Sequence, residues 1–79
     1  MYYIYVIASR SRNYIYVGLS NNMQRRFVEH QQGYNKTTKP YRPFKLVHSE
    51  VFKTRIDARK REKYLKSGVG KEWIKNTLL

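Results

Sequence analysis

The chain has 79 residues, no cysteine, and seventeen Lys and Arg against five acids, for a net charge of +12. This length leaves room for one domain, expected over residues 1–79, and the absence of cysteine excludes disulfides, thiolate metal sites and a cysteine nucleophile. No apolar run approaches the roughly 20 residues of a membrane-spanning helix and no secretory signal is visible, so we expect a cytoplasmic protein. A field this positive attracts polyanions, and nucleic acid is the expected partner rather than a membrane.

Two strands are predicted at the start of the chain, over residues 2–8 and 14–19, which alternate and are rich in β-branched and aromatic residues. The polar link between them predicts an antiparallel hairpin in which Ala8 faces Asn13 and Tyr5 faces Tyr16. The hairpin then has an aliphatic face, which is the natural core, and a tyrosine face, which is free to line a cleft. The aliphatic face consists of Ile4, Val6, Ile15 and Val17, and the tyrosine face of Tyr3, Tyr5, Tyr14, Tyr16 and Gly18.

A first helix is predicted over residues 23–32. One of the two asparagines at 21–22 can cap its start, and Gly33 stops it. Arg26 and His30 are four positions apart, so they lie on the same side of this helix.

The second half of the chain predicts a loop, a strand and two helices. The loop over 34–43 contains prolines, threonines and basic and aromatic side chains, and we expect it to contact a ligand. A third strand is predicted over 44–52, followed by a helix over 54–66 that is capped by its threonine and ends at Gly68. A last short helix is expected from Lys71 onward.

Glu62 is one of the few acids, and it lies on the same stripe of its helix as Ala58 and Leu65. An unpaired buried carboxylate costs several kcal/mol, so one interpretation is a structural ion pair with a nearby lysine or arginine. The other is a ligand for Mg²⁺ or Mn²⁺, because these ions use one or two carboxylates, keep several waters and take substrate phosphate as a further ligand. The residues alone leave both interpretations open.

The remaining polar side chains suit attack on a phosphodiester. The planar guanidinium of Arg26 matches the geometry of phosphate oxygens, although an arginine on a helix is ordinarily just solvated. His30 can orient water, share a proton with a tyrosine or bind phosphate. A free phenol is about 0.1% ionised at pH 7, a deficit of about 4 kcal/mol for a general base. We therefore expect the basic field, and Arg26 in particular, to lower the pKa of Tyr5 and Tyr16. Gly18 is expected to let a phosphate approach the backbone.

Together these residues resemble the GIY-YIG nuclease superfamily over nearly the whole chain. The motifs are Tyr3-Ile4-Tyr5, Tyr16-Val17-Gly18, Arg26, His30 and Glu62. The pattern is similar to the small stand-alone bacterial members, themselves like the N-terminal nuclease module of the excision-repair incision subunit. The resemblance implies an α+β fold, with a small three-stranded antiparallel sheet flanked by helices in the order strand, strand, helix, strand, helix, helix.

The resemblance also implies roles for the site residues. Tyr5 and Tyr16 flank the attacking water and one of them activates it, while Arg26 holds the scissile phosphate. Glu62 holds one divalent ion, Mg²⁺ or Mn²⁺, which stabilises the leaving oxygen. His30 matches a position that assists in some members.

We therefore predict a metal-dependent endonuclease that hydrolyses DNA in repair or processing. Many members use an asparagine or similar polar residue late in the chain, for which Asn76 is the only candidate. Either weak, structure-guided binding or a partner protein is expected to supply specificity. Two alternatives stay open, namely a module that binds nucleic acid without cutting it, and a basic protein that docks on an RNA–protein assembly and stacks its tyrosines on bases. Further nucleic-acid contacts are expected at Gly18, Arg25, Lys36, Lys39, Arg42 and Lys66.

Overall fold

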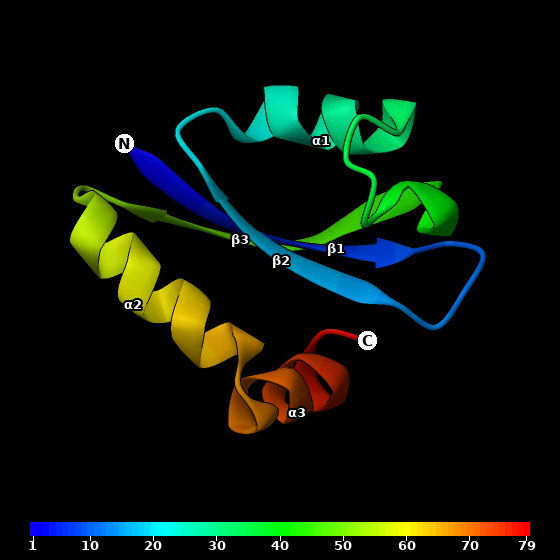
Figure 1. Cartoon of the computed structure of the whole chain (residues 1–79). Coiled ribbons are helices and arrows are strands. Elements are labelled where there is room, and N and C mark those ends of the chain that lie inside the picture. Colours follow the sequence, from blue (N-terminus) through cyan, green and yellow to red (C-terminus); the bar gives the residue numbers. More distant parts are fainter.

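The computed structural model describes residues 1–79 and has one antiparallel sheet with strand order β2-β1-β3. Three α-helices flank this sheet (Figure 1). The elements confirm the predicted α+β order, and the third strand has the predicted bounds. In chain order they are β1 (Tyr2–Ser9), β2 (Ile15–Ser20), α1 (Met23–Gln32), the 3₁₀ turn η1 (Lys39–Tyr41), β3 (Phe44–Phe52), α2 (Arg55–Lys66) and α3 (Gly68–Thr77).

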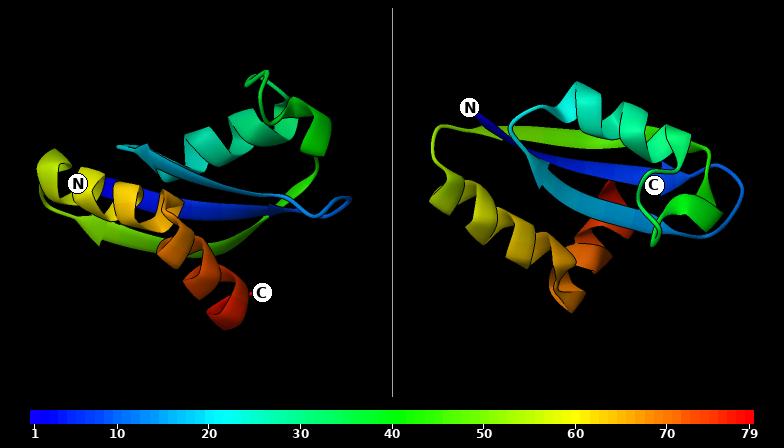
Figure 2. Two further views of the ribbon diagram at one scale, coloured as in Figure 1. Left: turned by 60° about the horizontal axis from the view of Figure 1, so that its bottom comes forward. Right: turned by 45° about the horizontal axis from the view of Figure 1, so that its top comes forward.

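Helices cover both faces of the sheet, with α1 on one side and α2 and α3 on the other (Figures 1 and 2). The aliphatic face forms a core, as predicted, and this core lies under α2 and α3, while the tyrosine face packs under α1. The expectation that the tyrosine face is free to line a cleft is therefore wrong for Tyr5, which is only 1% exposed. The first core contains Ile4, Val6, Val17, Ala58, Leu65 and Ile74, and the second contains Tyr5, Ile7 and Phe44 with Met23 and Phe27 of α1 against them.

The hairpin register differs from the prediction by two residues. Tyr5 lies opposite Gly18, and Tyr16 lies opposite Ile7. The reason is in the connection, where the Ser9 hydroxyl accepts hydrogen bonds from the backbone of the polar loop and Ser9 N donates to Tyr14 O at 2.9 Å. The loop therefore takes in Asn13. Because side chains alternate with a period of two, this shift leaves every residue on its predicted face.

A β-bulge in β3 changes which side chains face each helix layer. Ile7 pairs with Leu46 and Val6 pairs with His48, so Val47 has no partner in the ladder. The extra residue reverses the alternation, and Phe44 consequently joins the core under α1 whereas Phe52 packs toward α2 and α3.

The helix ends follow local chemistry, with one correction. The side chain of Asn22 accepts from Arg25 N, and Gly33 adopts the left-handed conformation (φ 81°) that ends α1. The prediction that Gly68 ends the second helix and that the last helix begins at Lys71 is wrong. Ser67 ends α2, and its hydroxyl accepts from Gly70 N at the start of α3.

Glycine also allows α2 and α3 to cross closely. A Cβ on Gly70 would lie 2.0 Å from Tyr64 O and 2.5 Å from the Cα of Leu65.

None of the helices combines the length and the apolar character needed to cross a membrane.

Candidate active site

The ring of Tyr5 crosses the neighbouring strand directly above Gly18. A Cβ at Gly18 would lie 2.2 Å from Cζ and 2.3 Å from the hydroxyl oxygen of Tyr5. Glycine is thus the residue that admits the ring, and the space above it is filled by Tyr5. This corrects the expectation that Gly18 leaves room for a phosphate at the backbone.

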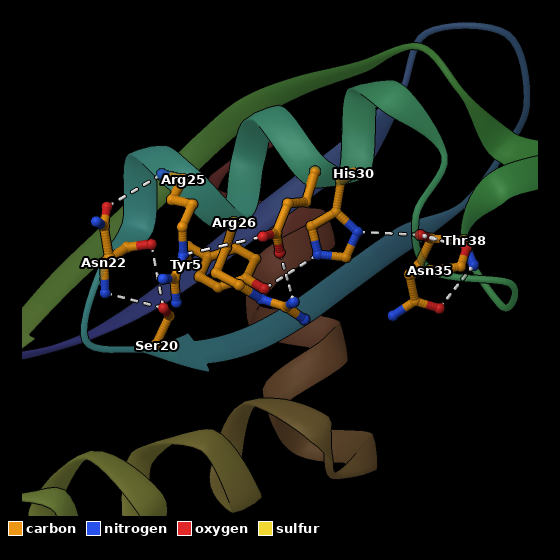
Figure 3. Close-up of polar contacts among 9 residues, drawn as sticks. Tyr5, Ser20, Asn22, Arg25, Arg26, His30, Asn35 and Thr38 are labelled. Atoms are coloured by element: carbon orange, nitrogen blue, oxygen red, sulfur yellow. Dashed lines mark hydrogen bonds and ion pairs between the residues drawn. The ribbon is translucent and has the colours of Figure 1, made fainter.

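The hydroxyl of Tyr5 lies in a buried hydrogen-bond chain (Figure 3). It is 3.1 Å from Nε2 of His30, and Nδ1 of His30 is 3.0 Å from Oγ1 of Thr38. His30 is 1% exposed and Thr38 is fully buried. The ring of Tyr16 completes this cluster, with its centroid 4.9 Å from that of His30 and 6.3 Å from that of Tyr5.

Burial sets the protonation states of the hydrogen-bonded Tyr5 and His30. Desolvation, followed by the nearby Tyr16, raises the pKa of Tyr5, even though the Arg26 guanidinium opposes the shift. The expectation that the basic surroundings lower the pKa of this phenol is therefore wrong. Desolvation and then Arg26 lower the pKa of His30. At neutral pH the pair consists of a neutral phenol and a neutral imidazole.

Arg26 lies beside the Tyr5 hydroxyl with part of its guanidinium exposed to solvent (Figure 3). Its Nη1 donates to Oε1 of Glu29 at 2.8 Å, which orients the fork on α1. Arg26, Glu29 and His30 line an open pocket together with Tyr34 and Asn35. A phosphate entering this pocket would meet the free N–H groups of Arg26.

Glu62 is 8% exposed, and its carboxylate is held by Lys66 at 3.1 Å and Arg59 at 3.5 Å. The ion pair that was one of its two interpretations is thus present. Its charge is also the smallest of the contributions that raise the pKa of Tyr5, and its carboxylate, which comes from the opposite helix layer, makes no hydrogen bond to the phenol.

The donor set around Glu62 limits which metal it could hold. No group of three or more His, Cys, Asp or Glu side chains occurs anywhere in the structure. A single carboxylate fits Mg²⁺ or Mn²⁺ only where water and a substrate phosphate supply the remaining ligands. The residues present therefore fit one Mg²⁺ or Mn²⁺ ion when substrate phosphate and water are also bound.

Four of the five predicted catalytic side chains, Tyr5, Tyr16, Arg26 and His30, are in one cluster. Glu62 lies on α2, where its contacts are with Lys66 and Arg59. Thr38 was not predicted, because nothing in the loop sequence distinguishes it from its neighbour Thr37. Asn76 is exposed on α3, where its amide donates to Glu72 at 3.5 Å, and it makes no hydrogen bond to the cluster. The side chains predicted to contact nucleic acid are exposed, namely Arg25, Lys36, Lys39, Arg42 and Lys66.

Comparison with known proteins identifies the family. Residues 1–76 match the family model described as the GIY-YIG catalytic domain. The chain belongs to the GIY-YIG family. This confirms the resemblance seen in the sequence, and the GIY-YIG superfamily is a nuclease superfamily.

Small proteins of the same family are similar to this GIY-YIG domain over most of their length. A "UPF0213 protein" of Limosilactobacillus reuteri is 43% identical over 68 residues, covering 82% of this chain and 70% of that protein. Another, from Staphylococcus saprophyticus, is 34% identical over 67 residues, covering 84% of this chain and 80% of that protein. No solved structure matches the chain significantly.

Proposed function

We propose that this GIY-YIG domain is a divalent-metal-dependent endonuclease that hydrolyses DNA phosphodiesters in repair or processing. The observation that carries the proposal is the bond between the Tyr5 hydroxyl and Nε2 of His30, placed beside a guanidinium that faces an open pocket. The net charge of +12 supports a polyanionic substrate. The domain lacks an evident base-reading element, so a partner protein or the shape of the DNA would supply specificity.

In this mechanism Tyr5 and His30 together act as the general base. A phenolate is unfavourable, since an ordinary phenol already lies about 4 kcal/mol from ionisation at pH 7 and the pKa of Tyr5 is raised further. The pair avoids this species. Tyr5 takes a proton from the attacking water while passing its own proton to Nε2 of His30, and the positive charge develops on the imidazole.

Arg26 and Tyr16 position the reacting groups. The fork of Arg26 binds the scissile phosphate and stabilises its developing charge, while Glu29 keeps the guanidinium in place. The Tyr16 ring packs against His30 and forms the other wall beside the water.

Glu62 would hold one Mg²⁺ or Mn²⁺ ion, in exchange for its contacts with Lys66 and Arg59. When bound, the ion supplies Lewis-acid stabilisation of the leaving oxygen. The basic side chains at Arg25, Lys36, Lys39, Arg42 and Lys66 would follow the nucleic-acid backbone on either side.

One observation favours a second function, a module that binds nucleic acid without cutting it. Both oxygens of Glu62 already contact cationic side chains, which compete with a metal ion for this carboxylate. The RNA-docking alternative loses two of its candidate stacking rings, because Tyr14 and Tyr41 stack on each other with ring centroids 3.8 Å apart, although Tyr34 and Tyr64 remain exposed.

Cleavage of supercoiled plasmid and of branched DNA, with Mg²⁺ or Mn²⁺, tests the proposal. We expect nicking by the wild-type protein and its loss in Glu62→Gln and Arg26→Ala. Glu72→Gln, an equivalent change at an exposed position of α3, is the matched control and should cut normally. Cleavage that persists unchanged in Glu62→Gln and Arg26→Ala would refute the assignment. Salt-sensitive binding without cleavage under every divalent ion would favour the binding module.

A further inference from the structure

Thr38 makes the only protein contact to the second nitrogen of His30. Its side chain is fully buried, and its hydroxyl lies 3.0 Å from Nδ1 (Figure 3). The residue belongs to the loop between α1 and β3, and the mechanism described above gives Thr38 itself no role. A buried polar contact of this kind requires a donor on one side and an acceptor on the other.

The direction of the protons follows from the groups around the Tyr5 hydroxyl. Arg26 can only donate, so the proton of the neutral phenol has Nε2 of His30 as its acceptor. A neutral imidazole with a bare Nε2 carries its proton on Nδ1 and donates it to Thr38 Oγ1. The Thr38 hydroxyl in turn donates to the carbonyl oxygen of Asn35 at 3.4 Å. Every proton in this chain has an acceptor.

The loop holds Thr38 in place through contacts at both ends. The side chain of Asn35 accepts from Thr37 N at 2.8 Å and from Thr38 N at 3.4 Å, which closes a tight turn. Further along, the Tyr41 ring stacks on Tyr14 of the hairpin with an angle of 6° between the ring planes. Thr38 is thus positioned before any substrate binds.

We propose that Thr38 is a positioning residue that holds His30 in the Nδ1–H tautomer and so keeps Nε2 free to receive the Tyr5 proton. The charged and titratable groups facing His30 are Tyr5 and Tyr16 from the sheet and Arg26 and Glu29 from α1. None of these hydrogen-bonds to Nδ1. The Thr38 hydroxyl, whose own proton is directed to Asn35 O, is the acceptor there and fixes the tautomer together with the Tyr5 phenol at Nε2. The consequence for cleavage rests on the proposed function, whereas the tautomer itself does not.

The tautomer is measured directly by long-range ¹H–¹⁵N NMR of ¹⁵N-histidine-labelled protein. The chain has two histidines, and the His48→Gln variant assigns their signals. We expect the Nδ1–H form in the wild type and in Thr38→Ser, and a shift toward the Nε2–H form in Thr38→Val. The control is Thr37→Val, because this neighbouring hydroxyl is exposed and its replacement should leave the spectrum unchanged.

Cleavage rates give the second readout. We expect Thr38→Val to cut about ten- to a hundredfold more slowly, the range found when the partner that orients a metal-ligating histidine is lost, with Thr38→Ser restoring the rate. An Nε2–H tautomer in the wild type would overturn the inference, as would an unchanged tautomer in folded Thr38→Val. Where that variant does not fold, the wild-type spectrum still tests the tautomer itself, and an Nε2–H form there overturns the inference. If the tautomer is as expected but no form of the protein cleaves DNA, the proposed function fails and the role of Thr38 in selecting the tautomer stands.

Discussion

Replacing Gly18 with alanine would place a Cβ 2.2 Å from Cζ and 2.8 Å from Cε1 of Tyr5. The nearest approach is well over 1 Å short of the roughly 3.5 Å at which carbon atoms touch. Tyr5 is 1% exposed and packed under α1, so its ring has no free space to move into. Gly18 has an ordinary negative φ, and the penalty is therefore steric and carries no backbone strain.

The expected magnitude is a loss of about 2 kcal/mol in the free energy of unfolding. Overpacking in a filled core costs about 1–3 kcal/mol, and this overlap belongs at the upper end. Alanine offsets about 0.4–1 kcal/mol by restricting the unfolded chain. A domain of this size has a stability of about 4–12 kcal/mol, so the loss is readily measured by urea denaturation. Cleavage should fall as well, because the displaced ring takes its hydroxyl away from His30.

A double-mutant cycle with Tyr5→Leu isolates the steric term. Leucine lacks the ring atoms that would collide with the new Cβ, so we expect the Gly18→Ala penalty to disappear in that background, with a coupling energy of about 2 kcal/mol. Gly68→Ala is the control, because no atom lies within 4 Å of a Cβ there and the change should be neutral or slightly stabilising. An equal Gly18→Ala penalty in both Tyr5 backgrounds would refute the reasoning.

Three further predictions concern Arg26, His30 and Lys39. Arg26→Lys keeps the charge but loses the planar fork, and we expect kcat to fall about a hundredfold, as for the loss of a single transition-state donor; an unchanged kcat would contradict a phosphate-binding role. The pKa of His30 is lowered on folding, so the unfolded chain takes up a proton first as the pH falls. Unfolding free energy should therefore drop below about pH 6.5, the ordinary histidine value, and continue to fall until the folded pKa is passed. Urea melts between pH 7.5 and 5 measure this slope, which should shrink in His30→Gln; an equal slope in both proteins would show that His30 is not its source. For DNA binding, Lys39→Gln should reduce the slope of log K against log salt by about 0.9 if its side chain contacts one phosphate, and fluorescence anisotropy across a salt series gives that slope.

Local patterns in the sequence are sufficient for the order of the elements and for most of their ends. The helix caps at Asn22 and Thr54 satisfy backbone groups within three residues of themselves, and Gly33 adopts the conformation that glycine favours. The buried stripe of α2, including Glu62, follows from helical periodicity alone. These features depend on neighbours along the chain, and the structure confirms them.

The hairpin register and the start of α3 depended on hydrogen bonds that strand and helix patterns do not encode. The Ser9 hydroxyl sets the length of the loop, and Ser67 both ends α2 and caps α3. Alternation still placed every hairpin residue on its correct face, because the error was an even number of residues.

Sequence by itself determined the family, the element order and the chemical types available to the site, because motif spacing and periodicity are fixed by the order of residues along the chain. Only the tertiary structure decided how those groups act on one another. Tyr5 and His30 are 25 positions apart, and burial between the sheet and α1 keeps both neutral, whereas the basic composition and Arg26 had predicted a lowered pKa for the phenol. Desolvation depends on every atom that packs around a group, and these atoms come from the sheet, α1 and the loop that carries Thr38.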